Sequence, residues 1–196
     1  MVITREQLKQ VTDEDFYSGR ILHNIFAYKF LKKAVSPIGD IISFIAPMVV
    51  EGDNLIDLED SLSKDYIYSE SAINFLIEIP NTDIFGAICF QRLFNAQLGS
   101  LICTRYLQKS GYVDGDDIMI IEGEEHKKCS VSIAAHKNNC ALIHTGINIQ
   151  AGPSAPSFAF STELDDTAAH KFMQEAENIF QNMTSDIHIA SRKVIV

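Results

Sequence analysis

Apolar and polar positions alternate most regularly between residues 127 and 149, and this alternation predicts two β-strands. Side chains on a strand point to opposite faces in turn, so every second residue shares a face. The two alternating runs, 127–135 and 140–149, flank the polar segment 136–139 (HKNN). β-branched runs around an Asn-rich break are typical of an antiparallel hairpin, which we expect to lie at the centre of the fold.

The length of the hairpin turn decides which faces coincide, because a slip of one residue inverts a strand. A two- or four-residue turn would pair Ile133 with His144 and separate the polar faces of the two strands. A three-residue turn pairs Ser132 with His144 and gathers the polar side chains on one face. We predict the three-residue turn, since an unpaired polar group in an apolar layer costs about 1–3 kcal/mol. The expected cross-strand pairs are Ser132–His144, Ser130–Gly146 and Lys128–Asn148.

Helical and strand patterns flank the hairpin. Apolar residues recur every three or four positions in 21–33, in 83–109 and after Asp165 or Asp166, which predicts three helices. Shorter runs predict strands at 40–46 and 118–122, and a strand or short helix at 71–79. These patterns predict a single domain, 1–196, of the α/β or α+β class.

Composition and charge narrow the class of partner. The chain is 46% hydrophobic and 21% charged, which is typical of a globular protein, and its net charge is −10. Nucleic acids and anionic membranes reward clustered Lys and Arg, so neither is expected as the main partner. No apolar run of about 18 residues is present, and the four cysteines show no CxxC spacing. We expect a cytoplasmic protein with free thiols.

Several acidic and basic residues outside the hairpin are candidates for binding. Asp57, Glu59 and Asp60 could hold Mg²⁺ or Ca²⁺, which prefer carboxylate oxygens, although an ordinary acidic turn would have the same composition. Glu78 lies between two isoleucines and is either a solvent-facing residue, which we favour, or a placed ligand-binding carboxylate. Arg92 interrupts the longest helical pattern and is either exposed or, if buried, paired.

The hairpin carries the strongest candidates for chemistry. No P-loop, GxGxxG, HExxH or GxSxG motif is present. Ser130 or Ser132 with His144 could form a nucleophile–base pair, but no third member is identifiable. Lys128 could stabilise negative charge on a carboxyl, phosphoryl or acyl-adenylate oxygen, or it could be a surface lysine at a strand edge.

The hairpin resembles two central strands of the biotin and lipoate protein ligase superfamily, which includes octanoyl transferases. The resemblance makes Lys128 the match of the family's catalytic lysine. It also aligns His144, Gly146 and Asn148 with an H-G…N strand, with Thr145 inserted between His144 and Gly146. A broader resemblance, to a domain-of-unknown-function family believed to share this class II synthetase-like fold, rests on GDIISFIAPMVV, LIDLEDSLSKDYIYS, QRL, GDDIMIIEGEEHKKCSVSIA and LIHTGINI.

The resemblance implies an α+β fold, with helices packed on a mixed, mainly antiparallel sheet, and a pocket over the polar face of the hairpin. It makes ATP and Mg²⁺ possible cofactors, yet the RRxSGGG-type segment, the glycine-rich ATP loop and the PCG nucleophile of the active enzymes are missing. Two hypotheses follow. The chain binds a small carboxylate, acyl or nucleotide-like ligand through Lys128 and His144, with possible acyl- or adenylyl-transfer chemistry, aided by Ser130, Ser132, Gly146 and Asn148. Alternatively, it is a non-catalytic interaction or scaffold protein that could form a homodimer.

Overall fold

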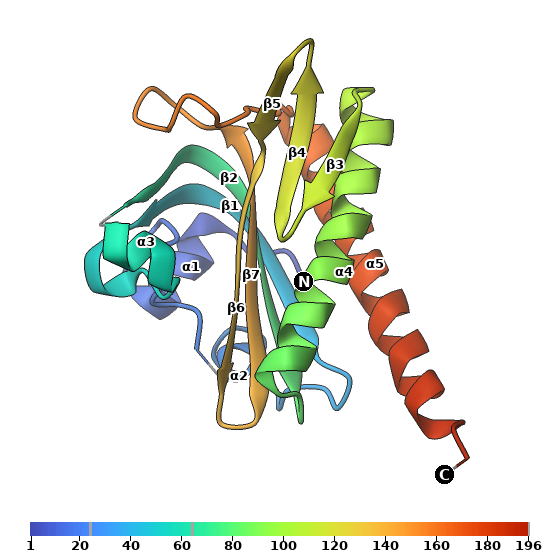
Figure 1. Ribbon diagram of the computed structural model, residues 1–196. Helices are drawn as coiled ribbons and strands as arrows, with labels where there is room; N and C mark the ends of the chain where they lie inside the picture. Colours follow the sequence, from blue (N-terminus) through green and yellow to red (C-terminus); the bar gives the residue numbers. More distant parts are fainter. Residues whose placement is uncertain (24, 64, 196) are drawn as a thin grey trace.

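The computed structural model describes residues 1–23, 25–63 and 65–195, and it has the predicted α+β architecture (Figure 1). The helices are α1 (Arg5–Thr12), α2 (Phe26–Leu31), η1 (Gly52–Asn54), α3 (Leu58–Ser63), α4 (Ile84–Leu101), the π-helix η2 (Ile102–Leu107) and α5 (Asp166–Arg192). The strands are β1 (Asp40–Val50), β2 (Ile67–Pro80), β3 (Gly111–Asp114), β4 (Asp117–Glu122), β5 (Glu125–Lys128), β6 (Ser130–Lys137) and β7 (Cys140–Gln150).

The strands form two antiparallel sheets. The larger has four strands in the order β1-β2-β7-β6, and the smaller has three in the order β3-β4-β5. Parallel pairing among the described residues is limited to isolated bridges, at Val2–Ser43, Tyr17–Met48 and Lys128–Ala159. The break between the sheets falls at Cys129, which separates β5 from β6 and so divides the segment expected to be one strand.

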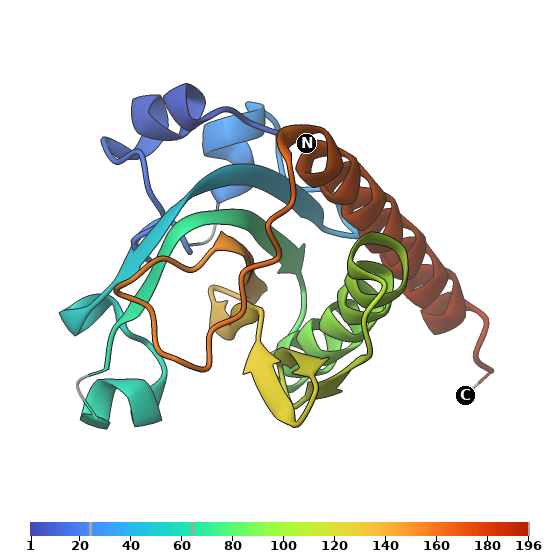
Figure 2. The ribbon, with the colours of Figure 1, turned by 90° about the horizontal axis from the view of Figure 1, so that it is seen from above.

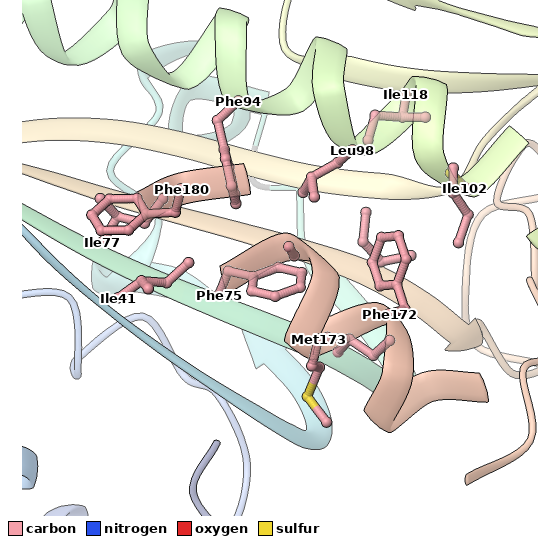
Figure 3. Packing of buried hydrophobic residues seen from close by; sticks show 14 of the residues in the cluster. Ile41, Phe75, Ile77, Phe94, Leu98, Ile102, Ile118, Phe172, Met173 and Phe180 are labelled. Atoms are coloured by element: carbon pink, nitrogen blue, oxygen red, sulfur yellow. The ribbon is translucent and has the colours of Figure 1, made fainter. Parts of the chain in front are cut away.

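Each face of the larger sheet is covered by different elements, and each has its own apolar core (Figure 2). On β2, Phe75 points to α4 and α5 and contacts Phe94 and Phe172 in edge-to-face geometry (Figure 3). The next residue, Leu76, points to the opposite face, where the N-terminal segment with α1 and α2 supplies residues such as Phe26. The period of two along β2 therefore feeds both cores.

The helix boundaries follow from local capping. Asp83 accepts a hydrogen bond from the Gly86 N–H at 2.7 Å and starts α4, and Asp165 accepts one from the Ala168 N–H at 2.8 Å and starts α5. The predicted helix at 83–109 is confirmed over most of its length, with its last turns in π geometry. None of the described helices is both long and apolar enough to cross a bilayer.

The hairpin turn is shorter than predicted. Only Asn138 and Asn139 connect the strands, with φ of 51° and 60°, the left-handed values that a two-residue turn of matching twist requires. Asparagine tolerates this conformation better than most residues, which favours the short turn here. The register therefore pairs Ile133 with His144 and Ser132 with Thr145, so the predicted three-residue turn and its pairs are wrong.

Candidate functional site

A cavity of about 520 Å³ lies beside the β6 edge of the larger sheet. Its walls come from the hairpin, from α3 and its neighbouring loops, from the β4–β5 pair, and from the loop after β7, which surround this edge in Figure 2. The volume is in the range of small-molecule sites. The lining includes Tyr17, Asp60, Lys128, His144, Asn148 and Phe158.

Lys128 reaches the cavity from the last position of β5. The strand pairs it with Met119, and its backbone N–H donates to the Phe158 carbonyl at 2.8 Å. Its Nζ lies 2.8 Å from Oδ1 of Asp117, and both side chains are about 30% exposed, at 29% and 30%. The predicted pairing of Lys128 with Asn148 is wrong, because the two residues lie in different sheets, yet both line the same cavity.

His144 is a buried wall of the cavity. Its ring stacks on Tyr17 at 3.7 Å between centroids and 11° between planes, and its Nε2 lies 3.0 Å from Oδ1 of Asn74. Because the Asn74 amide donates to two backbone carbonyls, its Oδ1 is the acceptor and His144 Nε2 carries the proton. Burial lowers the pKa of His144 to about 3, so the imidazole is neutral near pH 7.

Ser130 and Ser132 line the cavity as well, but the observed register places them on the strand face opposite His144. Ser130 Oγ accepts from the Ile118 N–H at 2.7 Å. Ser132 Oγ accepts from Gln91 at 2.9 Å and contacts the hydroxyl of Thr145 at 3.0 Å, beneath α4. Its one contact with His144 is to the backbone carbonyl, so the predicted serine–imidazole pair is not formed.

Glu78, Arg92 and Gly146 do not line the cavity among the described residues. Glu78 is buried, contrary to the solvent-facing prediction, and accepts from the Ile25 N–H at 2.6 Å and the Ala27 N–H at 3.2 Å at the start of α2. Arg92 is partly exposed, with its Nη1 3.1 Å from Oδ1 of Asp116. Gly146 lies against Met48, whose Sδ would collide with any added Cβ.

The acidic run 57–60 does line the cavity. Asp57 Oδ1 accepts from the backbone N–H groups of Glu59 at 2.9 Å and Asp60 at 3.2 Å, which orders the first turn of α3. Burial, followed by repulsion from Asp57, raises the pKa of Asp60. Across residues 1–23, 25–63 and 65–195, no group of three or more His, Cys, Asp or Glu side chains could hold a metal ion.

Sequence reasoning missed three acidic residues of the cavity. Asp65 follows α3, while Asp116 and Asp117 precede and begin β4. The sequence DGDD at 114–117 predicts a turn. Its three carboxylates next to a strand are the signal that could also have indicated a site. Burial raises the pKa of Asp117 against the opposing effect of Lys128.

The charge of the described cavity lining does not fit ATP. Among its described lining residues, six carry carboxylates, no arginine is present, and Lys128 is the one permanent cation. Lys128 is already paired with Asp117. A triphosphate needs several cationic or N–H donors around it, and here it would face acidic side chains instead. The Mg²⁺ that would accompany it also lacks a ligand cluster in the described residues.

Comparison with known proteins supplies the family. Residues 7–195 match the model of a domain of unknown function, DUF366. The chain belongs to the DUF366 family. No curated protein matches it.

Solved structures extend this DUF366 assignment to the fold. A protein of unknown function from Pyrococcus horikoshi is similar over 100% of this chain and 98% of its own, with a TM-score of 0.82 and 21% identity. A bipartite lipoate protein ligase from Thermoplasma acidophilum is similar over 74% and 71%, with a TM-score of 0.51 and 12% identity. P. falciparum LipL1, solved in complex with lipoate, is similar over 93% of this chain and 62% of its own, with a TM-score of 0.52 and 12% identity.

These similarities confirm the predicted family and fold. The DUF366 chain has the α+β fold seen in the lipoate protein ligase from T. acidophilum and in LipL1, at 12% sequence identity to each. At such low identity the likeness concerns the fold. The roles of the cavity residues are therefore inferred from the contacts that they make in this chain.

Proposed function

We propose that the DUF366 cavity binds a small molecule with a carboxylate or acyl group, and that Lys128 contacts that group. The observation that carries this proposal is the Lys128 ammonium, which lines a cavity of about 520 Å³ where Asp117 Oδ1 holds it at 2.8 Å. The pair occupies one oxygen of Asp117 and leaves other Nζ protons free to bond a ligand. Lipoate, the ligand of the LipL1 structure, is itself a carboxylate.

Within this proposal His144 shapes the wall rather than transferring protons. Its ring is neutral, stacked on Tyr17 and bonded to Asn74, so it is neither a strong acid nor free to move. Lys128 is then the candidate for stabilising negative charge on an acyl oxygen. Acyl handling is compatible with the acidic cavity, whereas adenylyl transfer and a nucleotide-like ligand are disfavoured by its carboxylates.

The experiment compares Lys128→Ala with Lys127→Ala in titration calorimetry, using hexanoate and lipoate as carboxylate probes. Lys127 is the matched control because it pairs with Glu125 at 2.9 Å and does not line the cavity. We expect saturable binding to the wild type and to Lys127→Ala, and at least a tenfold loss in Lys128→Ala. Equal binding by Lys128→Ala and the wild type would refute the proposal.

A second candidate function, homodimerisation, is favoured by an apolar groove of about 600 Å³ between α4 and the end of α5. Leu93 and Ile187, which line it, are 44% and 45% exposed. The C-terminal part of α5 also projects beyond the sheets (Figure 1). Sedimentation velocity would test this candidate: we expect a salt-insensitive dimer that Leu93→Glu converts to monomer, and a monomeric wild type would refute it.

A further inference from the structure

Tyr17 lines the cavity from the segment between α1 and α2, and both its main chain and its ring are held in place. Its backbone N–H donates to the Pro47 carbonyl at 2.8 Å, and its carbonyl accepts from the Val49 N–H at 2.9 Å, which fixes the main chain beside β1. Its ring stacks on the buried ring of His144 in β7, with 3.7 Å between the centroids. A side chain anchored in this way holds its hydroxyl oxygen in a fixed position.

The hydroxyl of Tyr17 has no hydrogen-bond partner among the described residues, although only 3% of the residue is exposed. The oxygen is not sealed off from solvent. Among the buried and half-buried residues that the structure describes, the one sealed side-chain atom without a partner is Asn148 Oδ1. Because Tyr17 lines the cavity, its hydroxyl opens into the cavity. Polar groups of buried residues are rarely left without a partner, so this one indicates a bound molecule that supplies it.

The chemistry of the Tyr17 hydroxyl selects an uncharged partner. Burial raises the pKa of this hydroxyl, which therefore stays protonated at neutral pH and is a neutral donor. Leu22, Val50 and Leu55 pack in the same apolar cluster as Tyr17 and line the same cavity. A carbonyl or hydroxyl oxygen of a ligand could bond Tyr17 there without the cost of bringing a charge into an apolar lining.

We propose that the ligand of this cavity carries a neutral oxygen in addition to the carboxylate or acyl group contacted by Lys128, and that the Tyr17 hydroxyl donates a hydrogen bond to this oxygen. Tyr17 belongs to the apolar cluster under α1 and α2, whereas Lys128 belongs to the smaller sheet, so each contacts its own part of the ligand. This inference rests on the proposed function, because it adds a second recognition element to the same ligand. The substrate class is then an oxo or hydroxy carboxylate.

The test compares hexanoate with three six-carbon acids that each add one neutral oxygen: 4-oxohexanoate, 5-oxohexanoate and 6-hydroxyhexanoate. Calorimetric titrations of the full chain compare the wild type with Tyr17→Phe, which removes the hydroxyl and keeps a ring to stack on His144. Tyr66→Phe is the matched control, because Tyr66 lines the same cavity but its hydroxyl already donates to the Ser154 carbonyl at 2.7 Å. Thermal melting of each variant checks that it is folded.

We expect at least one of the oxygen-bearing acids to bind the wild type about tenfold more tightly than hexanoate, the effect of one added hydrogen bond. Tyr17→Phe should abolish this preference and leave hexanoate binding unchanged, while Tyr66→Phe should keep the preference. The melting temperature of Tyr17→Phe should be no lower than that of the wild type, because the hydroxyl has no bond within the protein to lose.

Three results would overturn the inference. The first is a wild type that prefers none of the oxygen-bearing acids, or a preference that Tyr17→Phe retains. The second is a loss of hexanoate binding in Tyr17→Phe as large as the loss for the other acids, since the hydroxyl would then contact the carboxylate. The third is a lower melting temperature in Tyr17→Phe, which would show that the hydroxyl bonds the protein.

The two proposals fail separately in this design. Hexanoate binding that depends on Lys128, together with no preference for an added oxygen, would keep the proposed function and remove the contact with Tyr17. Hexanoate binding that is absent or independent of Lys128 would remove the proposed function. A preference for an added oxygen that Tyr17→Phe abolishes would in that case still assign the neutral oxygen to Tyr17.

Discussion

Polar side chains on the two faces of the β6–β7 hairpin are satisfied to different degrees. Beneath α4, Ser132 and Thr145 form a closed network with Gln91 and Asn95, with contacts between 2.9 and 3.0 Å. On the face of His144, the side-chain oxygen of Asn148 is buried and has no hydrogen-bond partner among the described residues. Buried polar groups that are fully bonded hold a fold together, whereas a buried acceptor left unpaired costs stability.

The largest expected effect is the pH dependence of stability that His144 contributes. Its pKa is lowered to about 3 in the folded protein, against about 6.5 unfolded, so only the unfolded state gains this proton between those values. The contribution of His144 to the free energy of unfolding is fully present above pH 6.5 and is lost as the pH falls towards 3. The free energy of unfolding should be about 3 kcal/mol lower at pH 4.5 than at pH 7.5 from this group alone.

His144→Gln is the matching variant, since glutamine can still donate to Asn74 but does not titrate. Urea unfolding across this pH range should show a shallower pH dependence in the variant than in the wild type. Parallel curves for the two proteins would contradict a neutral, buried His144.

A smaller effect is expected within the network beneath α4. Thr145→Val keeps the shape but removes the hydroxyl that donates to Asn95 Oδ1 at 2.9 Å, leaving a buried acceptor unpaired. We expect a loss of about 1–3 kcal/mol in the free energy of unfolding, measured by chemical denaturation.

Thr184→Val is the control, because the hydroxyl of this buried threonine bonds the Phe180 carbonyl of its own helix at 2.9 Å. That carbonyl lies within α5 and keeps its helical hydrogen bond. Similar losses in the two variants would argue against a special role for the network.

The smallest loss is expected at Asn148. Because its buried Oδ1 has no partner to lose, Asn148→Leu should not lower the free energy of unfolding and should raise it by up to about 1–3 kcal/mol. Differential scanning calorimetry would measure this change. A loss comparable to that of Thr145→Val would break the comparison, since Asn148 would then have a structural role.

The sequence predicted the elements better than the way they meet. Periods of two and of three to four residues identified most strands and helices, because burial of one face imposes those periods. The hairpin register could not be obtained in this way, since polarity alone does not show that Gln91 and Asn95 would satisfy Ser132 and Thr145 from another helix.

The candidate site was predicted in part for the same reason. Lys128 and Asn148 were selected from one alternating stretch and from a family resemblance, and they share a cavity although they lie in different sheets. Glu78 bonds the start of α2, more than 50 positions away in sequence, a contact with no local signal. The carboxylates of Asp57, Glu59 and Asp60 line the same cavity as Lys128, although the two segments lie far apart in the sequence.

A crystal structure of the protein with hexanoate tests the central claim most directly. We expect the probe in the cavity, with its carboxylate about 3 Å from Lys128 Nζ. Probe density absent from the cavity at saturating concentration, or a carboxylate bound away from Lys128, would contradict it.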